Sequence, residues 1–212
     1  MARDGKRKTR EQFAKKRVPQ LGYYIIVTDT KETEQNYFYG LRDSIPQDLQ
    51  GKIVIKVSKA KTDELVEEAK NLRSLQPQYC EPWIVFDRDQ VKNFDTIISK
   101  AEENQINVGW SNPCIEIWFN AYFGSMPTYM DSVRCCKGFS RVFKTNSGQY
   151  YRKSDKNIFK KLNSVGDENV AIEIAKKKHS DWLRDGVSVP SRMNPCTTLY
   201  QLVDEINCKT KE

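Results

Sequence analysis

The sequence predicts an α/β protein that has a mostly parallel β-sheet flanked by helices and a helical C-terminal part. In its first half, short runs rich in β-branched and aromatic residues alternate with segments that show the apolar periodicity of helices. The runs end in polar or acidic residues, as is typical of strands buried on both faces of a parallel sheet. The 212 residues, 38% of them apolar, are enough for one domain with a sizeable core.

Strands and helices alternate regularly in this first half. We expect strands at residues 23–27, 52–57, 82–86 and 106–110. We expect the intervening helices at residues 33–42, 62–75 and 91–104. Right-handed crossovers would bring the carboxyl ends of the parallel strands to one edge of the sheet, which is where ligands gather in such folds.

The second half is expected to be mainly helical. Helices are predicted at residues 114–123, 158–162, 168–183 and 197–206. We interpret Asn112-Pro113 and Asn194-Pro195 as helix starts with proline at the first helical position. Residues 126–157 show no clear periodicity, so we predict an irregular insertion that carries basic and aromatic side chains.

The positive charge of the chain is concentrated at its N-terminus. The formal net charge is +7, and residues 1–17 supply +6 of it through eight basic and two acidic side chains. We therefore predict a basic, disordered arm at residues 1–20 and a single domain at residues 21–212. A basic balance often indicates a nucleic-acid partner, but here it describes the arm more than a folded binding face.

The sequence excludes several classes of protein. No window approaches 18 consecutive apolar residues and no apolar stretch follows the basic N-terminus, so we expect no membrane association and a cytoplasmic location. The six cysteines form no C-x-x-C pair, which favours free thiols. His179 is the single histidine, which excludes sites that need two, and we interpret it as a surface residue.

Acidic residues follow two of the predicted strands. Asp29 closes the first strand, Glu34 lies in the first turn of the next helix, and Asp87 and Asp89 close the third strand. At positions i and i+2 of an extended segment, Asp87 and Asp89 would point to the same side and could bind one Mg²⁺. Asp29 and Glu34 also have a simpler interpretation as helix-capping or first-turn acids.

Four segments together resemble RloB-like proteins. The stretch from Tyr24 to Phe38 is similar to the family's E-G-x-x-T-E-x-x-Y-F opening motif. The resemblance continues, in the family's order, through Val85-Phe86-Asp87-Arg88-Asp89, Ser111-Asn112-Pro113-Cys114-Ile115-Glu116-Ile117-Trp118 and Asn194-Pro195-Cys196-Thr197-Thr198. It implies a TOPRIM fold, related to that of OLD-type nucleases, and chemistry on phosphodiesters that depends on Mg²⁺, with Mn²⁺ as a substitute.

The resemblance implies roles for the four acids. Asp29 and Glu34 match the family's first two acids and are the catalytic candidates, whereas Asp87 and Asp89 match the metal-binding pair. Two departures lie in the first motif, where Asp29 replaces the usual glutamate and Thr30 the usual glycine. A general base displaced by about 1 Å can lose roughly a hundredfold in rate, so these departures favour a slowed or inactive site.

Further candidates lie later in the chain. Ser111 and Glu116 match the family's S-N-P-x-x-E-x-W segment and are metal-binding candidates, although helix capping also explains Glu116. Lys153 matches a family lysine and is a catalytic candidate that would stabilise a charged transition state. The candidates for nucleic-acid binding are Arg88, Lys137, Arg141, Lys144 and Arg152. A solvated loop with aromatic side chains in the core explains the last four equally well.

Three functional interpretations follow from the sequence and the resemblance. The leading one is a magnesium-dependent TOPRIM endonuclease that cuts DNA or RNA, with tRNA among the candidates, as an RloB-type effector of anti-phage abortive infection. The second is a weakened TOPRIM module that binds nucleic acid or an ATPase without cutting. The third, a primase or topoisomerase activity, is disfavoured because we expect 212 residues to be too few for the additional zinc-binding or tyrosine-bearing domain of such enzymes.

The sequence predicts the binding partners and the oligomeric state in less detail than the fold. The resemblance implies a partner AAA/ABC-type ATPase, and the 212 residues contain no P-loop motif of their own. The sequence leaves open whether the protein forms a homo-oligomer, whether one or two metal ions bind, and what triggers activity.

Overall fold

The computed structural model describes residues 21–29, 32–50, 52–75, 80–89 and 91–211. The predicted disordered arm at residues 1–20 and the departure from the family motif at Thr30 lie outside the described residues.

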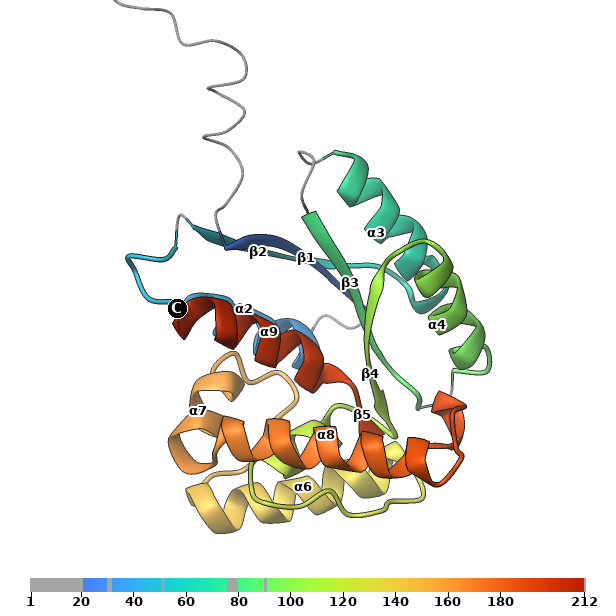
Figure 1. Ribbon diagram of the computed structural model, residues 1–212. Coiled ribbons are helices and arrows are strands. Elements are labelled where there is room, and N and C mark those ends of the chain that lie inside the picture. The colour runs from blue at the N-terminus through green and yellow to red at the C-terminus, as the bar shows by residue number, and fades with distance from the viewer. Residues whose placement is uncertain (1–20, 30–31, 51, 76–79, 90, 212) are drawn as a thin grey trace, which may run out of the picture.

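A five-stranded sheet with the strand order β2-β1-β3-β4-β5 runs through the centre of the structure (Figure 1). The first four strands are parallel to one another: β1 (Gly22–Thr28), β2 (Ile53–Lys59), β3 (Cys80–Asp87) and β4 (Asn107–Asn112). The short strand β5 (Cys196–Thr197) pairs with β4 in the antiparallel direction. Because helices flank this mostly parallel sheet, the predicted α/β class is confirmed.

Helices cover both faces of the sheet (Figure 1). On one face lie α3 (Leu65–Ser74), which follows a 3-10 turn at Thr62–Glu64, and α4 (Phe94–Glu103). On the other face, α2 (Thr33–Asp43), α5 (Glu116–Ala121) and α9 (Leu199–Lys211) contact the sheet. Three further helices pack mainly against these: α6 (Ser132–Ser147), α7 (Ile158–Val165) and α8 (Glu168–Arg184). Within the described residues, every helix is too short or too polar to span a bilayer.

Alternation along β1 assigns its side chains to two hydrophobic cores. Ile25 and Val27 pack toward α3 and α4, whereas Tyr24 and Ile26 pack toward α2, α5 and α9. All four are fully buried because β1 has strand neighbours on both sides and helices on both faces. The carboxyl end of β1 is therefore held rigidly next to that of β3.

The segment predicted to be irregular, residues 126–157, contains the 16-residue helix α6, so that prediction was wrong. Asp131 caps this helix, since its side chain accepts a 2.7 Å hydrogen bond from the Arg134 amide. Phe139 and Phe143 are buried one helical turn apart and fix α6 against α5. The basic residues of this segment, Arg141 between the two phenylalanines among them, hid this apolar spacing.

The two Asn-Pro pairs do not start helices as predicted. Asn112 is the last residue of β4 and Pro195 directly precedes β5, and both Asn-Pro peptide bonds are cis. The first α-helical residues after them are Glu116 and Leu199. The two prolines therefore flank the short β4–β5 ladder, in which Asn112 is opposite Cys196.

Candidate functional site

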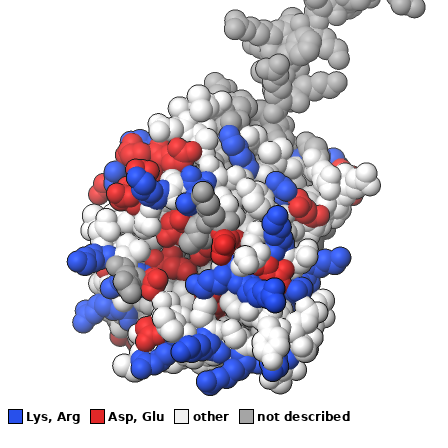
Figure 2. All heavy atoms as spheres, turned by 180° about the vertical axis from the view of Figure 1, so that it is seen from behind, with Lys and Arg blue, Asp and Glu red and all other residues white. Residues whose placement is uncertain are grey.

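A cleft of about 510 Å³ opens at the carboxyl ends of β1 and β3. Its lining includes all four predicted acids, which come from the end of β1, the first turn of α2 and the segment that begins at the end of β3: Asp29, Glu34, Asp87 and Asp89. On the face shown in Figure 2, acidic side chains gather near the centre and Lys and Arg side chains lie around them. The structure thus brings together acids that are far apart in the sequence.

Asp29 is partly buried and only half of its carboxylate is hydrogen-bonded. Its Oδ2 accepts a 3.2 Å hydrogen bond from the Thr62 hydroxyl. Its Oδ1 is buried and has no hydrogen-bond partner among the described residues. Burial, with a smaller contribution from the charge of Asp89, raises the pKa of Asp29 to about 6. The side chain is therefore close to its titration point near neutral pH.

Glu34 is the most deeply buried of the four acids, with 2% of its surface exposed. Burial raises its pKa to about 8, and the negative charges of Asp29 and Glu116 act in the same direction. A cluster of carboxylates with such raised pKa values is one that a cation would stabilise.

Asp87 and Asp89 both line the cleft but not for the predicted reason. Asp87 Oδ2 accepts a 3.0 Å hydrogen bond from the Ile115 amide, and burial together with the charges of Glu34 and Asp29 raises its pKa well above the ordinary value. At Asp89 the backbone φ is 23°, so the chain turns and the extended i, i+2 geometry does not exist. The Asp89 side chain is exposed and accepts a hydrogen bond from the Ser132 hydroxyl.

The two further metal candidates, Ser111 and Glu116, lie outside the lining of the cleft. The Ser111 hydroxyl is 3.1 Å from the Thr197 hydroxyl, within the β4–β5 pair. Glu116 is fully buried, and its Oε1 accepts 2.8 Å hydrogen bonds from the Tyr151 hydroxyl and the Cys136 thiol. Its Oε2 has no hydrogen-bond partner among the described residues.

Tyr151 and Cys136 are site residues that sequence reasoning missed. They lie 35 and 20 positions from Glu116 in the sequence, and no local sequence pattern predicts either contact. Burial, reinforced by the charge of Glu116, raises the pKa of both the Tyr151 hydroxyl and the Cys136 thiol. Both groups therefore stay protonated and donate to the carboxylate.

Lys153 lines the cleft. Its ammonium nitrogen is 3.7 Å from Glu116 Oε1, and its backbone carbonyl accepts a 3.4 Å hydrogen bond from the Thr33 hydroxyl. Burial disfavours the charged form, but the charge of Glu116 and those of neighbouring acidic groups together outweigh burial and raise the pKa of Lys153 above its ordinary value. Lys153 is thus a fixed positive charge beside four acids.

The candidates for nucleic-acid binding separate into two groups. Exposed basic residues recur on one side of α6 and form what we call the basic stripe: Arg134, Lys137, Arg141 and Lys144. Arg152 is exposed in the loop before α7. The Arg88 guanidinium instead donates to the carbonyls of Asp89 and Val91 and lies 5.9 Å over the Phe94 ring. Arg88 therefore braces the loop after β3.

The donor set in the cleft suits a hydrated, hard cation. Among the described residues, no group of three or more His, Cys, Asp or Glu side chains is arranged to enclose a metal ion. Mg²⁺ commonly binds through one or two carboxylates and keeps several water ligands, so such a group is not required. The unpartnered Asp29 Oδ1 at the cleft and the raised pKa values of its neighbours are the features that fit a cation.

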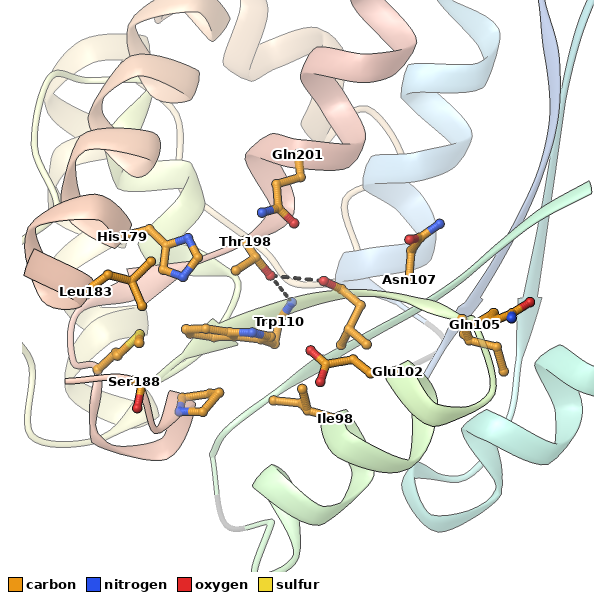
Figure 3. A pocket seen from close by; sticks show the side chains of 14 residues that line it. Ile98, Glu102, Gln105, Asn107, Trp110, His179, Leu183, Ser188, Thr198 and Gln201 are labelled. Carbon is orange, nitrogen blue, oxygen red and sulfur yellow. Dashed lines mark hydrogen bonds between the residues drawn. The ribbon is translucent and has the colours of Figure 1, made fainter. Parts of the chain in front are cut away.

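His179 lies in a second cavity, of about 440 Å³, that shares no lining residue with the cleft (Figure 3). The Trp110 ring lies in this cavity with His179 and Gln201 beside it, and Glu102 approaches from α4. His179 Nδ1 is 3.1 Å from the Tyr200 hydroxyl, and burial lowers its pKa. His179 is thus half-buried rather than on the open surface as we had interpreted it.

Fold and site define an α/β protein with a carboxylate-lined cleft at the carboxyl edge of a parallel sheet. A family model described as RloB-like protein matches residues 24–206, so the chain belongs to the RloB-like family and the resemblance seen in its motifs is confirmed. Searches of curated proteins and of solved structures gave no match.

Proposed function

We propose that this protein is a magnesium-dependent endonuclease of TOPRIM type that hydrolyses phosphodiester bonds in DNA or RNA, with tRNA among the candidate substrates. The observation that carries the proposal is the meeting of Asp29, Glu34, Asp87 and Asp89 in one cleft, with the Lys153 ammonium at its mouth. Hydrolysis of a phosphodiester needs positive charge for the phosphate and a base for the attacking water, and this cleft offers groups for both.

Asp87 and Asp89 are the residues that would hold Mg²⁺, because both line the cleft and Asp89 is open to solvent. When bound, Mg²⁺ supplies positive charge that offsets the charge of the phosphate. The same charge would offset the repulsion between the Glu34 and Asp29 carboxylates, which contributes to the raised pKa of Glu34.

Asp29 or Glu34 accepts the proton of the attacking water in this proposal. A general base works best when its pKa lies near the working pH, and burial raises these two pKa values to about 6 and about 8. Lys153 stays protonated next to Glu116 and contacts the phosphate oxygens as negative charge develops on them. Each role thus falls to a side chain of suitable charge at the cleft.

The biological setting is part of the same proposal. Membership in the RloB-like family supports a role as a cytoplasmic effector of anti-phage abortive infection. The same family membership supports control by a separate AAA/ABC-type ATPase. The 212 residues contain no P-loop motif, so ATP dependence would come from that partner.

A second candidate function is a module that binds nucleic acid or the ATPase without cutting. Asp29 favours this candidate, because its side chain is one methylene shorter than the glutamate usual in the family's motif.

Metal binding and cleavage measured on the same samples test the two candidates. We would titrate Mg²⁺ and Mn²⁺ into wild type, Asp87→Asn and Asp89→Asn by calorimetry, and incubate each with labelled DNA, RNA and tRNA. Asp48→Asn, which alters an exposed acid in the loop before β2, is the matched control. Cleavage by wild type and the control but not by the two site variants supports the nuclease. Nucleic-acid binding without cleavage in either metal would contradict it and favour the binding module.

A further inference from the structure

A hollow of about 480 Å³, which we call the side pocket, opens directly beside the cleft. Its walls come from the end of β4, the start of α6 and the segment before β5, and include Asn112, Pro113, Met130, Val133, Ser191 and Asn194. Asp89 and Ser132 line both the cleft and the side pocket, and their hydrogen bond forms the wall between the two. A molecule that reacts in the cleft therefore has its adjoining group at the side pocket.

The charges of the side pocket disfavour a phosphate. Asp89 and Asp131 contribute two carboxylates, and the Arg88 guanidinium already donates to two loop carbonyls. The Arg134 guanidinium, 3.1 Å from Asp131 Oδ2, is engaged with that carboxylate. The basic groups described here are therefore already paired, which favours an uncharged group over an anion.

The rim of the side pocket is apolar and open to water. The Met130 and Val133 side chains are 83% and 61% exposed, and Pro113 lines the wall between β4 and α5. Large apolar side chains in such positions commonly stack on or wedge between nucleobases in proteins that bind nucleic acid. The rim therefore suits a flat ring with apolar faces.

The wall also presents a hydrogen-bond acceptor. Asn194 Nδ2 donates a 2.8 Å hydrogen bond to the Tyr129 carbonyl, which fixes the orientation of the amide. Asn194 Oδ1 is buried and has no hydrogen-bond partner among the described residues. An unsatisfied buried acceptor of this kind is unfavourable, and the amino group of a base that reaches it would relieve that cost.

The basic stripe provides a path for the attached backbone. It begins at Arg134, next to Val133 in the first turn of α6, and continues to Lys144 near the end of that helix. Four residues spaced over ten positions extend about 15 Å along the helix, at 1.5 Å per residue. Phosphates can thus follow α6 while one base enters the side pocket.

We propose that the side pocket binds an unpaired nucleobase next to the phosphodiester in the cleft, so that the substrate is single-stranded or locally unpaired nucleic acid. This inference rests on the proposed function. A base inside an intact duplex cannot reach the pocket unless it is unstacked and flipped out, which is energetically unfavourable. The pocket thus selects unpaired strands, whether of DNA or of RNA.

The test uses the full chain and oligonucleotides that carry the fluorescent base 2-aminopurine, as single strands and as perfect duplexes, in DNA and RNA versions. Fluorescence is recorded in Mg²⁺ directly after mixing, and cleavage products are measured later in the same samples. The site variant is Met130→Ala combined with Val133→Thr, two exposed positions where a folding defect is not expected. Leu75→Ala, at a 75% exposed apolar residue just after α3, is the matched control.

We expect the control to behave as wild type and the site variant to bind the single strand about fivefold to tenfold more weakly. An unlabelled strand that is abasic at the reporter position, added as a competitor, should bind the wild type and the site variant equally. Equal binding of duplex and single strand, or wild-type affinity in the site variant, would overturn the inference. If only the DNA oligonucleotides or only the RNA oligonucleotides show the fluorescence change, that result identifies the sugar that the site accepts.

The outcome for the side pocket is separable from the outcome for the nuclease. A fluorescence change that depends on Met130 and Val133, without cleavage, supports the pocket and counts against the nuclease. Cleavage that the site variant performs as well as wild type, without a fluorescence change, supports the nuclease and overturns the pocket.

Discussion

Asp29→Asn tests whether the cleft holds negative charge that the protein alone does not compensate. Burial, with a smaller contribution from the charge of Asp89, raises the pKa of Asp29 from its ordinary value of 3.8 to about 6. The folded protein therefore holds this proton more tightly than the unfolded chain does. The contribution of Asp29 to the free energy of unfolding is therefore largest below about pH 4. It falls as the pH rises toward about 6 and stays at the lower level above that pH.

The size of the effect follows from the shift in pKa. About two pKa units at 1.36 kcal/mol each correspond to about 3 kcal/mol for the charged form. Because Asp29 is partly open to water, we expect Asp29→Asn to stabilise the metal-free protein by about 1–3 kcal/mol at about pH 8. Asparagine keeps an oxygen that can accept the Thr62 hydroxyl, so this hydrogen bond is retained. At about pH 4 the variant should match wild type.

Urea denaturation in EDTA at several pH values measures this gap in the free energy of unfolding, provided that the m value is unchanged. Asp48→Asn again serves as the exposed control. Added Mg²⁺ should narrow the gap at about pH 8, since a ligand of the folded wild type stabilises it by about 2.7 kcal/mol at a hundred times its Kd. No gap at that pH, or a gap of equal size at all pH values, would refute the reasoning.

Three further predictions concern activity and binding. Asp87→Asn and Asp89→Asn should each lower cleavage of a labelled oligonucleotide by at least about a hundredfold, while circular dichroism shows an unchanged fold. Lys153→Met keeps the apolar stem but removes the charge, so it should lower kcat by about tenfold to a hundredfold with little change in KM, and a change in KM alone would assign Lys153 to ground-state binding. Removal of residues 1–17 takes away a net charge of +6 and should flatten the salt dependence of nucleic-acid binding, by about 0.7–0.9 in log–log slope per lost phosphate contact. An unchanged slope would show that the arm is not a contact.

The convergence of the acids was predictable from the sequence, because the residues that follow neighbouring parallel strands lie at the same edge of the sheet. Once the runs at β1 and β3 were interpreted as neighbouring parallel strands, Asp29 and Asp87 had to lie at the same edge. The position of Asp89 was not predictable in this way. Its backbone turns at φ 23°, and its amide donates to the Pro113 carbonyl from a distant part of the chain.

Helix α6 and strand β5 show two other limits of prediction from the sequence. The apolar face of α6 rests on few residues, among them Phe139 and Phe143, so basic side chains dominated the pattern. Strand β5 has two residues and exists because Ser111 and Asn112 offer it a partner strand. No periodicity can be recognised in so short a segment.

Glu116 shows how one buried carboxylate can organise the site without lining it. Its Oε1 accepts from Tyr151, and Lys153, two residues further along the same loop, lies 3.7 Å from the same oxygen. Cys136 donates to that oxygen from α6, so Glu116 ties the loop before α7 to the helix that carries the basic stripe. A full metal-ligand role would compete with these three contacts. The geometry therefore favours Glu116 as the residue that positions the Lys153 ammonium, with cation binding left to the carboxylates that line the cleft.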